Sequence, residues 1–118
     1  KRAGLPVKAF LMVGLPGESW ESIKNTINFV KETNPEYYTL FTFTPFPGTD
    51  FYDSPDKYGI KFRTNDWSEF FNVGGANVGG KTIDTAFLSA EEIQDARKMI
   101  LAELPAQKGK LQDYYRKV

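Results

Sequence analysis

The stretch Phe10–Ser19 constrains the fold of this chain more than any other. An apolar run of strand length ends at Gly14, passes through a proline and a second glycine, and meets a glutamate and Ser19, which can cap a helix. The pattern predicts a strand, a tight loop and a helix. Because ligands in α/β folds are held at the carboxyl ends of strands, this loop is the first candidate site.

The flanking residues extend this pattern to a βαβ unit. Residues 7–13 are apolar at every position except Lys8, which predicts a strand in a parallel sheet covered by helices. After the cap the apolar positions follow a helical period up to Asn34, and residues 37–43 are aromatic or β-branched, as in a second strand. The short connections predict parallel strands. The residues expected on the apolar helix face are Trp20, Ile23, Ile27, Phe29 and Val30.

A second stiff loop, residues 44–49, follows the second strand and contains two prolines. Because parallel strands end at the same edge of a sheet, the two loops are expected to share one rim. Glu18, Asp50 and Asp53 are candidate acids or bases there, or alternatively a helix-capping charge and two solvated carboxylates. The aromatic residues between positions 37 and 51 either stack a planar ligand or serve as packing.

The second half of the chain is less regular. Residues 50–58 are expected to form one or two helical turns, and residues 60–88 a long excursion with a small hairpin, anchored by aromatic side chains. The capping box Ser89–Glu92 predicts a helix from Ala90. Its expected apolar stripe is Ile93, Ala96, Ile100 and Leu104, and a last amphipathic segment is expected at residues 107–116 with Leu111, Tyr114 and Tyr115 inward.

Residues 75–82 satisfy the P-loop pattern G-x-x-x-x-G-K-[ST]. A functional P-loop must enter a helix directly after Lys81 and Thr82, so that helix amides hold the phosphates. Residues 83–88 have no helical face. We interpret the match as a coincidence in a glycine-rich loop and keep a nucleotide binder as a distant alternative.

Composition excludes several kinds of chemistry. The 118 residues include no cysteine and no histidine, so the chain holds no disulfide, thiolate zinc site, cysteine-bound cluster or histidine-based triad. The 15 basic and 15 acidic residues cancel, which gives no general attraction to nucleic acid or anionic membranes. No apolar run approaches the roughly 20 residues of a membrane span. We expect a cytoplasmic protein with no nucleic-acid partner.

Four segments together resemble the second half of a radical S-adenosylmethionine (SAM) domain: residues 1–7, 10–19, 34–37 and 44–52. The pairing of Gly-Leu-Pro-Gly-Glu with Pro-x-Pro-Gly-Thr is most similar to the cobalamin-binding radical SAM group, which includes the anaerobic magnesium-protoporphyrin monomethyl ester cyclase. A looser similarity continues through Trp67 and the Leu88–Glu92 helix start.

The resemblance implies a partial (β/α)₆ barrel of the TIM type. Residues 1–58 would be its last two βα units, and residues 59–118 a loop and a C-terminal helical extension. It further implies that the first strand end packs against the adenine of SAM and that the second lines the same pocket. The implied cofactor-binding residues are Met12, Val13, Gly14, Leu15, Pro16, Gly17, Glu18, Phe43, Thr44 and Pro45, with no catalytic or metal-ligating residue.

By the same resemblance, the parent protein is an oxidoreductase or methyltransferase that uses SAM, a 4Fe-4S cluster and, as a further candidate cofactor, cobalamin. The cluster cysteines lie outside this chain, which alone is expected to be inactive. Its expected partners are the N-terminal barrel half and cobalamin-type domain of the same polypeptide, and a small-molecule substrate. The rival interpretation is a stand-alone βαβ interaction module without a small-molecule site.

Overall fold

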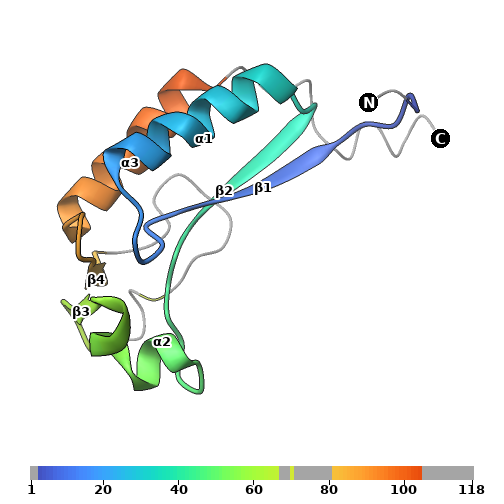
Figure 1. Ribbon diagram of the computed structural model, residues 1–118. Helices are drawn as coiled ribbons and strands as arrows, with labels where there is room; N and C mark the ends of the chain where they lie inside the picture. Colours follow the sequence, from blue (N-terminus) through green and yellow to red (C-terminus); the bar gives the residue numbers. More distant parts are fainter. Residues whose placement is uncertain (1–2, 67–69, 71–80, 105–118) are drawn as a thin grey trace.

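The structure, a computed structural model, describes residues 3–66, 70 and 81–104 (Figure 1). The expected segment at 107–116, Trp67 and residues 75–80 lie outside this range. No helix in the described ranges is long and apolar enough to cross a membrane. The elements are β1 (Lys8–Val13), α1 (Trp20–Thr33), β2 (Tyr37–Thr42), α2 (Asp50–Asp53), the 3₁₀ helix η1 (Pro55–Tyr58), β3 (Lys61–Phe62), β4 (Ile83–Asp84) and α3 (Ala90–Glu103).

The strands β1 and β2 are parallel neighbours, which confirms the predicted α/β class and the βαβ unit. Their register pairs Lys8 with Tyr37 and Val13 with Thr42. The pairing continues one residue further, because the Phe43 N–H donates to the Val13 carbonyl over 2.7 Å. Both strands therefore end at the same edge, as the sequence predicted.

Helix α1 begins where the sequence predicted, at the Ser19 cap. The Ser19 hydroxyl accepts from the Ser22 N–H, and the Ser22 hydroxyl accepts from the Ser19 N–H in return. The buried residues of α1 are Ile23, Ile27 and Val30. The prediction for Phe29 was wrong: its side chain is 62% exposed. One residue corresponds to a rotation of about 100° around a helix, so Phe29 points away from the face that holds Val30.

Helix α3 also begins at its predicted capping box, formed by Ser89 and Glu92. The two long helices run parallel and in register, because two bonds between them span the same sequence separation of 72 residues. Trp20 donates to Glu92 near the helix starts, and Lys31 pairs with Glu103 near the ends. The predicted apolar stripe of α3 is buried throughout: Ile93, Ala96, Ile100 and Leu104.

Both helices cover the same face of the two-stranded sheet (Figure 1). The core between them contains Val13 and Leu40, with Leu11 and Tyr38 packed against it. The strands were expected to be covered on both faces, and this expectation was wrong for the described residues. On the other face Phe10 is 70% exposed; its ring stacks against Phe41 with centroids 6.2 Å apart, and the Lys8 amine lies 5.2 Å from its centroid.

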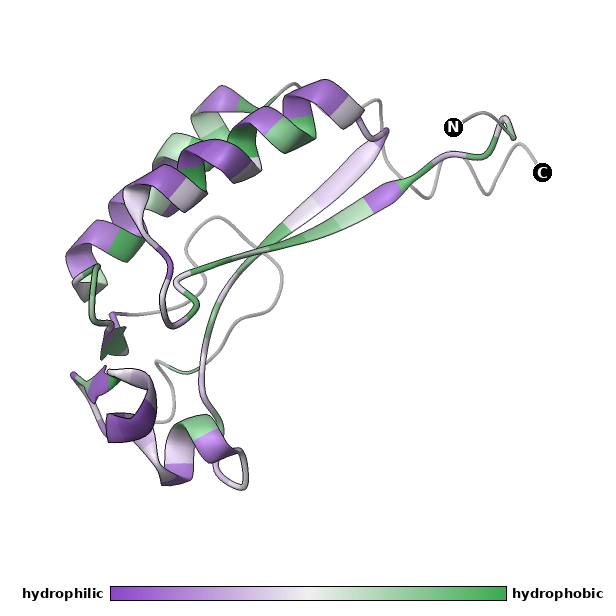
Figure 2. Cartoon of the chain, viewed as in Figure 1, coloured by the Kyte–Doolittle hydropathy of each residue, from purple (hydrophilic) through white to green (hydrophobic). Residues whose placement is uncertain are grey.

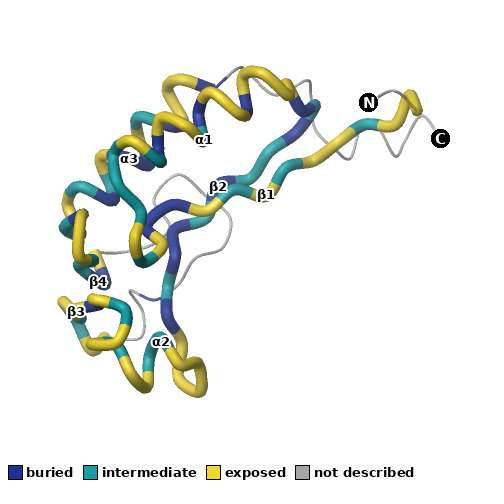
Figure 3. The backbone as a smooth tube through the Cα atoms, in the orientation of Figure 1, coloured by how far each residue is buried: buried dark blue, intermediate teal, exposed yellow. Residues whose placement is uncertain are grey.

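This uncovered face is apolar. Figure 2 shows β1 as predominantly hydrophobic after its polar start at Lys8, and Figure 3 shows exposed residues along the strand with burial at its carboxyl end. Met12, on the same face as Phe10, is 44% exposed. In the part of the chain that the structure describes, the core side of the sheet is buried, and Phe10 and Met12 on its other side are exposed.

A second, smaller core lies beyond the carboxyl end of β2. It contains Phe43, Ile60 and Ile83, with Phe51, Tyr58 and Phe62 packed against it. The strands β3 and β4 pair antiparallel through Lys61–Asp84 and Phe62–Ile83, which confirms the small hairpin expected between residues 60 and 88. This core holds α2, η1 and the hairpin together at one end of the sheet.

Candidate functional site

The two loops at the shared edge have the same turn design. In residues 15–18 the Glu18 N–H donates to the Leu15 carbonyl over 3.0 Å, and in residues 46–49 the Thr49 N–H donates to the Phe46 carbonyl over 3.2 Å. Each turn has proline second and glycine third, and the glycines have φ of +86° and +89°, as type II turns require. Ser19, the N-cap of α1, directly follows the first turn, and Thr49, the N-cap of α2, is the last residue of the second. Both loops are therefore stiff before any ligand binds.

Gly14 occupies the most constrained position of this rim. It is buried, its φ is +88°, and a Cβ added there would lie 3.0 Å from Cγ2 of Ile93 on α3. Glycine is required here for backbone conformation and for close approach to α3. A Cβ at Gly17, by contrast, would meet no atom within 4 Å. A Cβ at Gly48 in the second turn would likewise meet no atom within 4 Å, so both turns are open at their glycines, whereas Gly14 is packed.

Glu18 ties the turn to the strand end. Its Oε1 accepts a hydrogen bond from the Gly14 N–H over 2.8 Å, which closes the loop on itself. Burial raises the pKa of Glu18, and the hydrogen bond from Gly14 partly opposes this rise. The carboxylate thus accepts a hydrogen bond from the strand end, and it also directly precedes Ser19, the N-cap of α1.

Helix α3 supports the rim from behind. The Trp20 indole N–H donates to Oε2 of Glu92 over 3.1 Å, and the Arg97 guanidinium donates to the Leu40 carbonyl over 2.8 Å. Burial lowers the pKa of Arg97. The sequence predicted the start and the apolar stripe of α3, but it did not predict these contacts, because nothing in it pairs the helix with Trp20 or Leu40.

The structure separates the ten predicted site residues by exposure. Three of them are exposed: Met12, Leu15 and Gly17. Three more are partly exposed: Pro16, Glu18 and Thr44. The remaining four are buried within the chain: Val13, Gly14, Phe43 and Pro45. The exposed members are apolar side chains or backbone, which suits this part of the rim to contact with an apolar ligand surface.

Asp50 does not join Glu18 in a pair of carboxylates. It accepts hydrogen bonds from the Tyr58 hydroxyl and, over 3.0 Å, from the Lys57 amine. The Tyr58 hydroxyl and then Lys57 hold the pKa of Asp50 below its usual range. Within the described ranges there is no group of three or more histidine, cysteine, aspartate or glutamate side chains that suits a metal ion.

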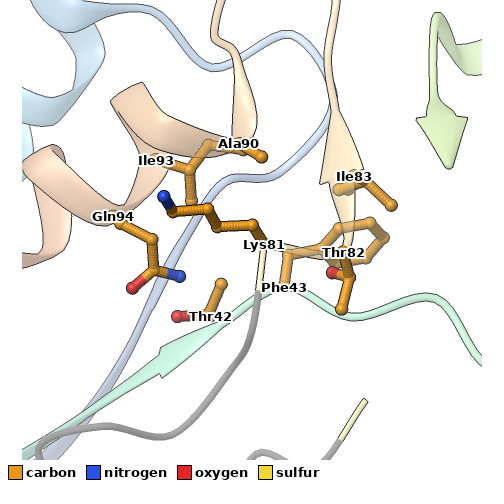
Figure 4. A pocket seen from close by; sticks show the side chains of 8 residues that line it. All are labelled: Thr42, Phe43, Lys81, Thr82, Ile83, Ala90, Ile93 and Gln94. Atoms are coloured by element: carbon orange, nitrogen blue, oxygen red, sulfur yellow. The ribbon is translucent and has the colours of Figure 1, made fainter. Parts of the chain in front are cut away.

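The end of the P-loop pattern can be followed in Figure 4. Lys81 and Thr82 line a cavity of about 10 Å³, the size of one water molecule, between the end of β2 and the first turns of α3. Strand β4 follows directly, and the next helix begins only at Ala90. The helix that a P-loop needs after its lysine and threonine is therefore missing at this position, in agreement with the interpretation of a coincidental match.

Comparison with known proteins gives partial relatives. Over 70 residues the chain is 38% identical to the ribosomal protein uS12 methylthiotransferase RimO of Myxococcus xanthus, which covers 59% of this chain and 15% of that protein. Over 102 residues it is 24% identical to the tRNA-2-methylthio-N(6)-dimethylallyladenosine synthase of Psychrobacter cryohalolentis, covering 86% of this chain and 19% of that protein. These relatives are methylthiotransferases.

A third relative agrees with them. The RimO protein of Leptospira biflexa is 35% identical over 48 residues, 41% of this chain and 11% of that protein. The chain thus spans less than a fifth of the length of these relatives. No protein-family model and no solved structure matches it. None of the relatives named here belongs to the cobalamin-binding group, so the finer placement expected from the sequence is not supported.

Proposed function

We propose that this chain is part of a radical SAM enzyme related to the methylthiotransferases, and that its rim contributes to the SAM site. The observation that carries the proposal is the parallel register of β1 and β2, which brings two stiff Pro-Gly turns to one edge. The relatives support it, because methylthiotransferases of this type are radical SAM enzymes. Cobalamin is not part of the proposal.

The exposed residues of the rim fit a flat, largely apolar group. Met12 and Leu15 are exposed large apolar side chains at the strand end, and open space lies over Gly17. Such surfaces pack well against an adenine ring. Val13 and Phe43 are buried behind them and act as support rather than as contacts.

The chain's own part in the reaction is to bind and to orient. SAM at a 4Fe-4S cluster supplies one-electron chemistry, and cluster ligands must come from elsewhere, because this chain has no cysteine. The Glu18–Gly14 bond and the Ile93 contact fix the loop backbone before the ligand arrives. By their names the relatives modify a ribosomal protein or a tRNA, so the proposal includes a macromolecular substrate in place of the expected small molecule.

The test uses the full-length protein that contains this chain, whose coding sequence should include a C-x-x-x-C-x-x-C motif upstream. Met12→Lys places a charge on the proposed adenine surface and should weaken SAM binding at least about tenfold in anaerobic equilibrium dialysis. Phe29→Lys is the matched control, since Phe29 is also an exposed apolar residue but lies on α1. Its SAM affinity should stay within about twofold of wild type.

Unchanged SAM affinity in a folded Met12→Lys protein would reject this site. Absence of SAM binding in every variant, wild type included, would favour the interaction-module interpretation. Gly14→Val is not a useful test, because its side chain would meet Ile93 and disturb folding as well as binding.

A further inference from the structure

A second cavity lies outside the rim, in the smaller core region formed by α2, η1 and β3. Its volume is about 230 Å³, and it is lined by Tyr52, Pro55, Phe62, Thr64, Asn65 and Phe70. The rings of Tyr52 and Phe62 meet edge to face with centroids 5.2 Å apart, and those of Phe62 and Phe70 are 6.3 Å apart. Four of the six described lining residues are therefore aromatic or proline.

We propose that this cavity binds a neutral, flat heteroaromatic ring of the nucleobase class. A cavity of about 150 Å³ with apolar walls holds one benzene ring, so 230 Å³ has room for a one- or two-ring base. Aromatic walls favour flat ring systems, which they can contact face to face or edge to face. The shape and the wall chemistry thus select the same kind of ligand.

The polar side of the cavity distinguishes a base from a purely apolar ring. The Asn65 amide can donate and accept at once, as it does when it pairs with the edge of a base. The Thr64 hydroxyl accepts from the Asp66 N–H over 3.1 Å and keeps its own hydrogen for donation. An indole or phenol ring has only one polar group to hydrogen-bond with Asn65 and Thr64. A base has several, so it can satisfy more of the donors and acceptors of these two side chains.

Charge argues that the ring, and not a phosphate, is recognised here. None of the six lining residues is charged. Of the cations on the neighbouring elements, Lys57 pairs with Asp50, and Arg63 pairs with Asp84 and Glu91. Lys61 of β3 is exposed and is not among the residues that line the cavity. The proposed ligand is therefore the base moiety of a nucleoside, bound without help from its phosphates.

This site is separate from the proposed SAM rim. None of the ten predicted cofactor-binding residues lines the cavity. Tyr52, which does line it, lies in α2, directly after the second rim loop. Figure 1 shows α2 and β3 beyond the carboxyl end of β2. The test described next needs no cluster and no SAM, so its failure would leave the rim proposal untouched.

The experiment is a titration of the complete ¹⁵N-labelled 118-residue chain with adenosine, followed by NMR. We expect saturable shifts of the Asn65 side-chain amide and of the Phe62 and Thr64 backbone amides. Phe62→Leu, which removes a ring of the wall, and Asn65→Ala, which removes the polar pair, should each raise the dissociation constant at least about threefold. Phe29→Leu on α1 is the control and should not change it.

Several results would overturn the proposal. One is the absence of saturable shifts with adenosine. Another is equal or tighter binding of N-acetyl-tryptophanamide, which would make the cavity a site for aromatic side chains. A third is adenosine binding that neither variant weakens. If Phe62→Leu does not fold, the exposed Asn65→Ala variant decides alone.

Discussion

Two glycines of the rim allow the cost of close packing to be measured apart from the cost of backbone conformation. Gly14 and Gly17 have nearly the same φ, +88° and +86°. An alanine at either position must adopt a left-handed backbone, which costs about 1–2 kcal/mol. Only at Gly14 does the new methyl group also meet a neighbour, Cγ2 of Ile93 at 3.0 Å.

The difference between the two alanine variants follows from this contact. Ile93 is buried in the core, so it cannot move aside freely, and overpacking of this kind costs about 1–3 kcal/mol. We therefore expect Gly17→Ala to lower the free energy of unfolding by about 1–2 kcal/mol and Gly14→Ala by about 2–5 kcal/mol. The reduced freedom of the unfolded chain affects both variants alike and cancels in the comparison.

Urea denaturation followed by tryptophan fluorescence measures both free energies of unfolding. A third variant isolates the contact: in an Ile93→Ala background, Gly14→Ala should cost no more than Gly17→Ala does, because the methyl group then has space. Equal losses for Gly14→Ala and Gly17→Ala in the wild-type background would show that α3 does not pack against the end of β1, and the reasoning about the rim would fail with it.

Three further predictions concern charge, capping and the uncovered face. Burial raises the pKa of Glu18 above its ordinary 4.5, so the contribution of Glu18 to the free energy of unfolding is complete below pH 4.5 and is lost as the pH rises through the folded pKa. The side chain in Glu18→Gln still accepts from the Gly14 N–H but carries no charge. This variant should be more stable than wild type at pH 7 but not at pH 4, as measured by urea titration. Asp84 accepts from the Ala90 N–H over 2.7 Å at the start of α3, so Asp84→Ala should cost about 0.5–2 kcal/mol, and an unchanged melting temperature would contradict this. Phe10→Ser should change stability by less than about 1 kcal/mol while reducing self-association in sedimentation velocity; a large loss of stability would mean that this face is covered.

Local signals predicted the elements well. Ser19 and Ser89 cap helices at the positions their sequences indicate, and the parallel pairing followed from the short connections around α1. The common edge of the two loops followed in turn from the pairing. These properties depend on residues close together in the chain, which is why they could be derived from the sequence.

What could not be predicted depends on contacts between distant residues. Nothing near Gly14 indicates that Ile93 lies against it, and nothing near Trp20 indicates Glu92 as its partner. The proline and glycine residues indicated a tight loop and a stiff loop, but that both contain the same type II turn became evident only from the structure. The apolar strand suggested cover on both faces, whereas Phe10 lies exposed, because a pattern of apolar residues cannot say which of them a single chain covers.

The parallel pairing of α1 with α3 has a consequence for synthesis of the chain. Glu92, the hydrogen-bond partner of Trp20, lies 72 residues further along the chain, and the ribosome needs roughly 4–14 s to synthesise that length. During that interval the βαβ unit is complete in sequence but has neither the Ile93 contact behind Gly14 nor the second helix beside α1. The part of the apolar side of α1 that packs against α3 is then exposed to other nascent chains and to chaperones. The first half of the chain is therefore most vulnerable to aggregation just before α3 leaves the ribosome.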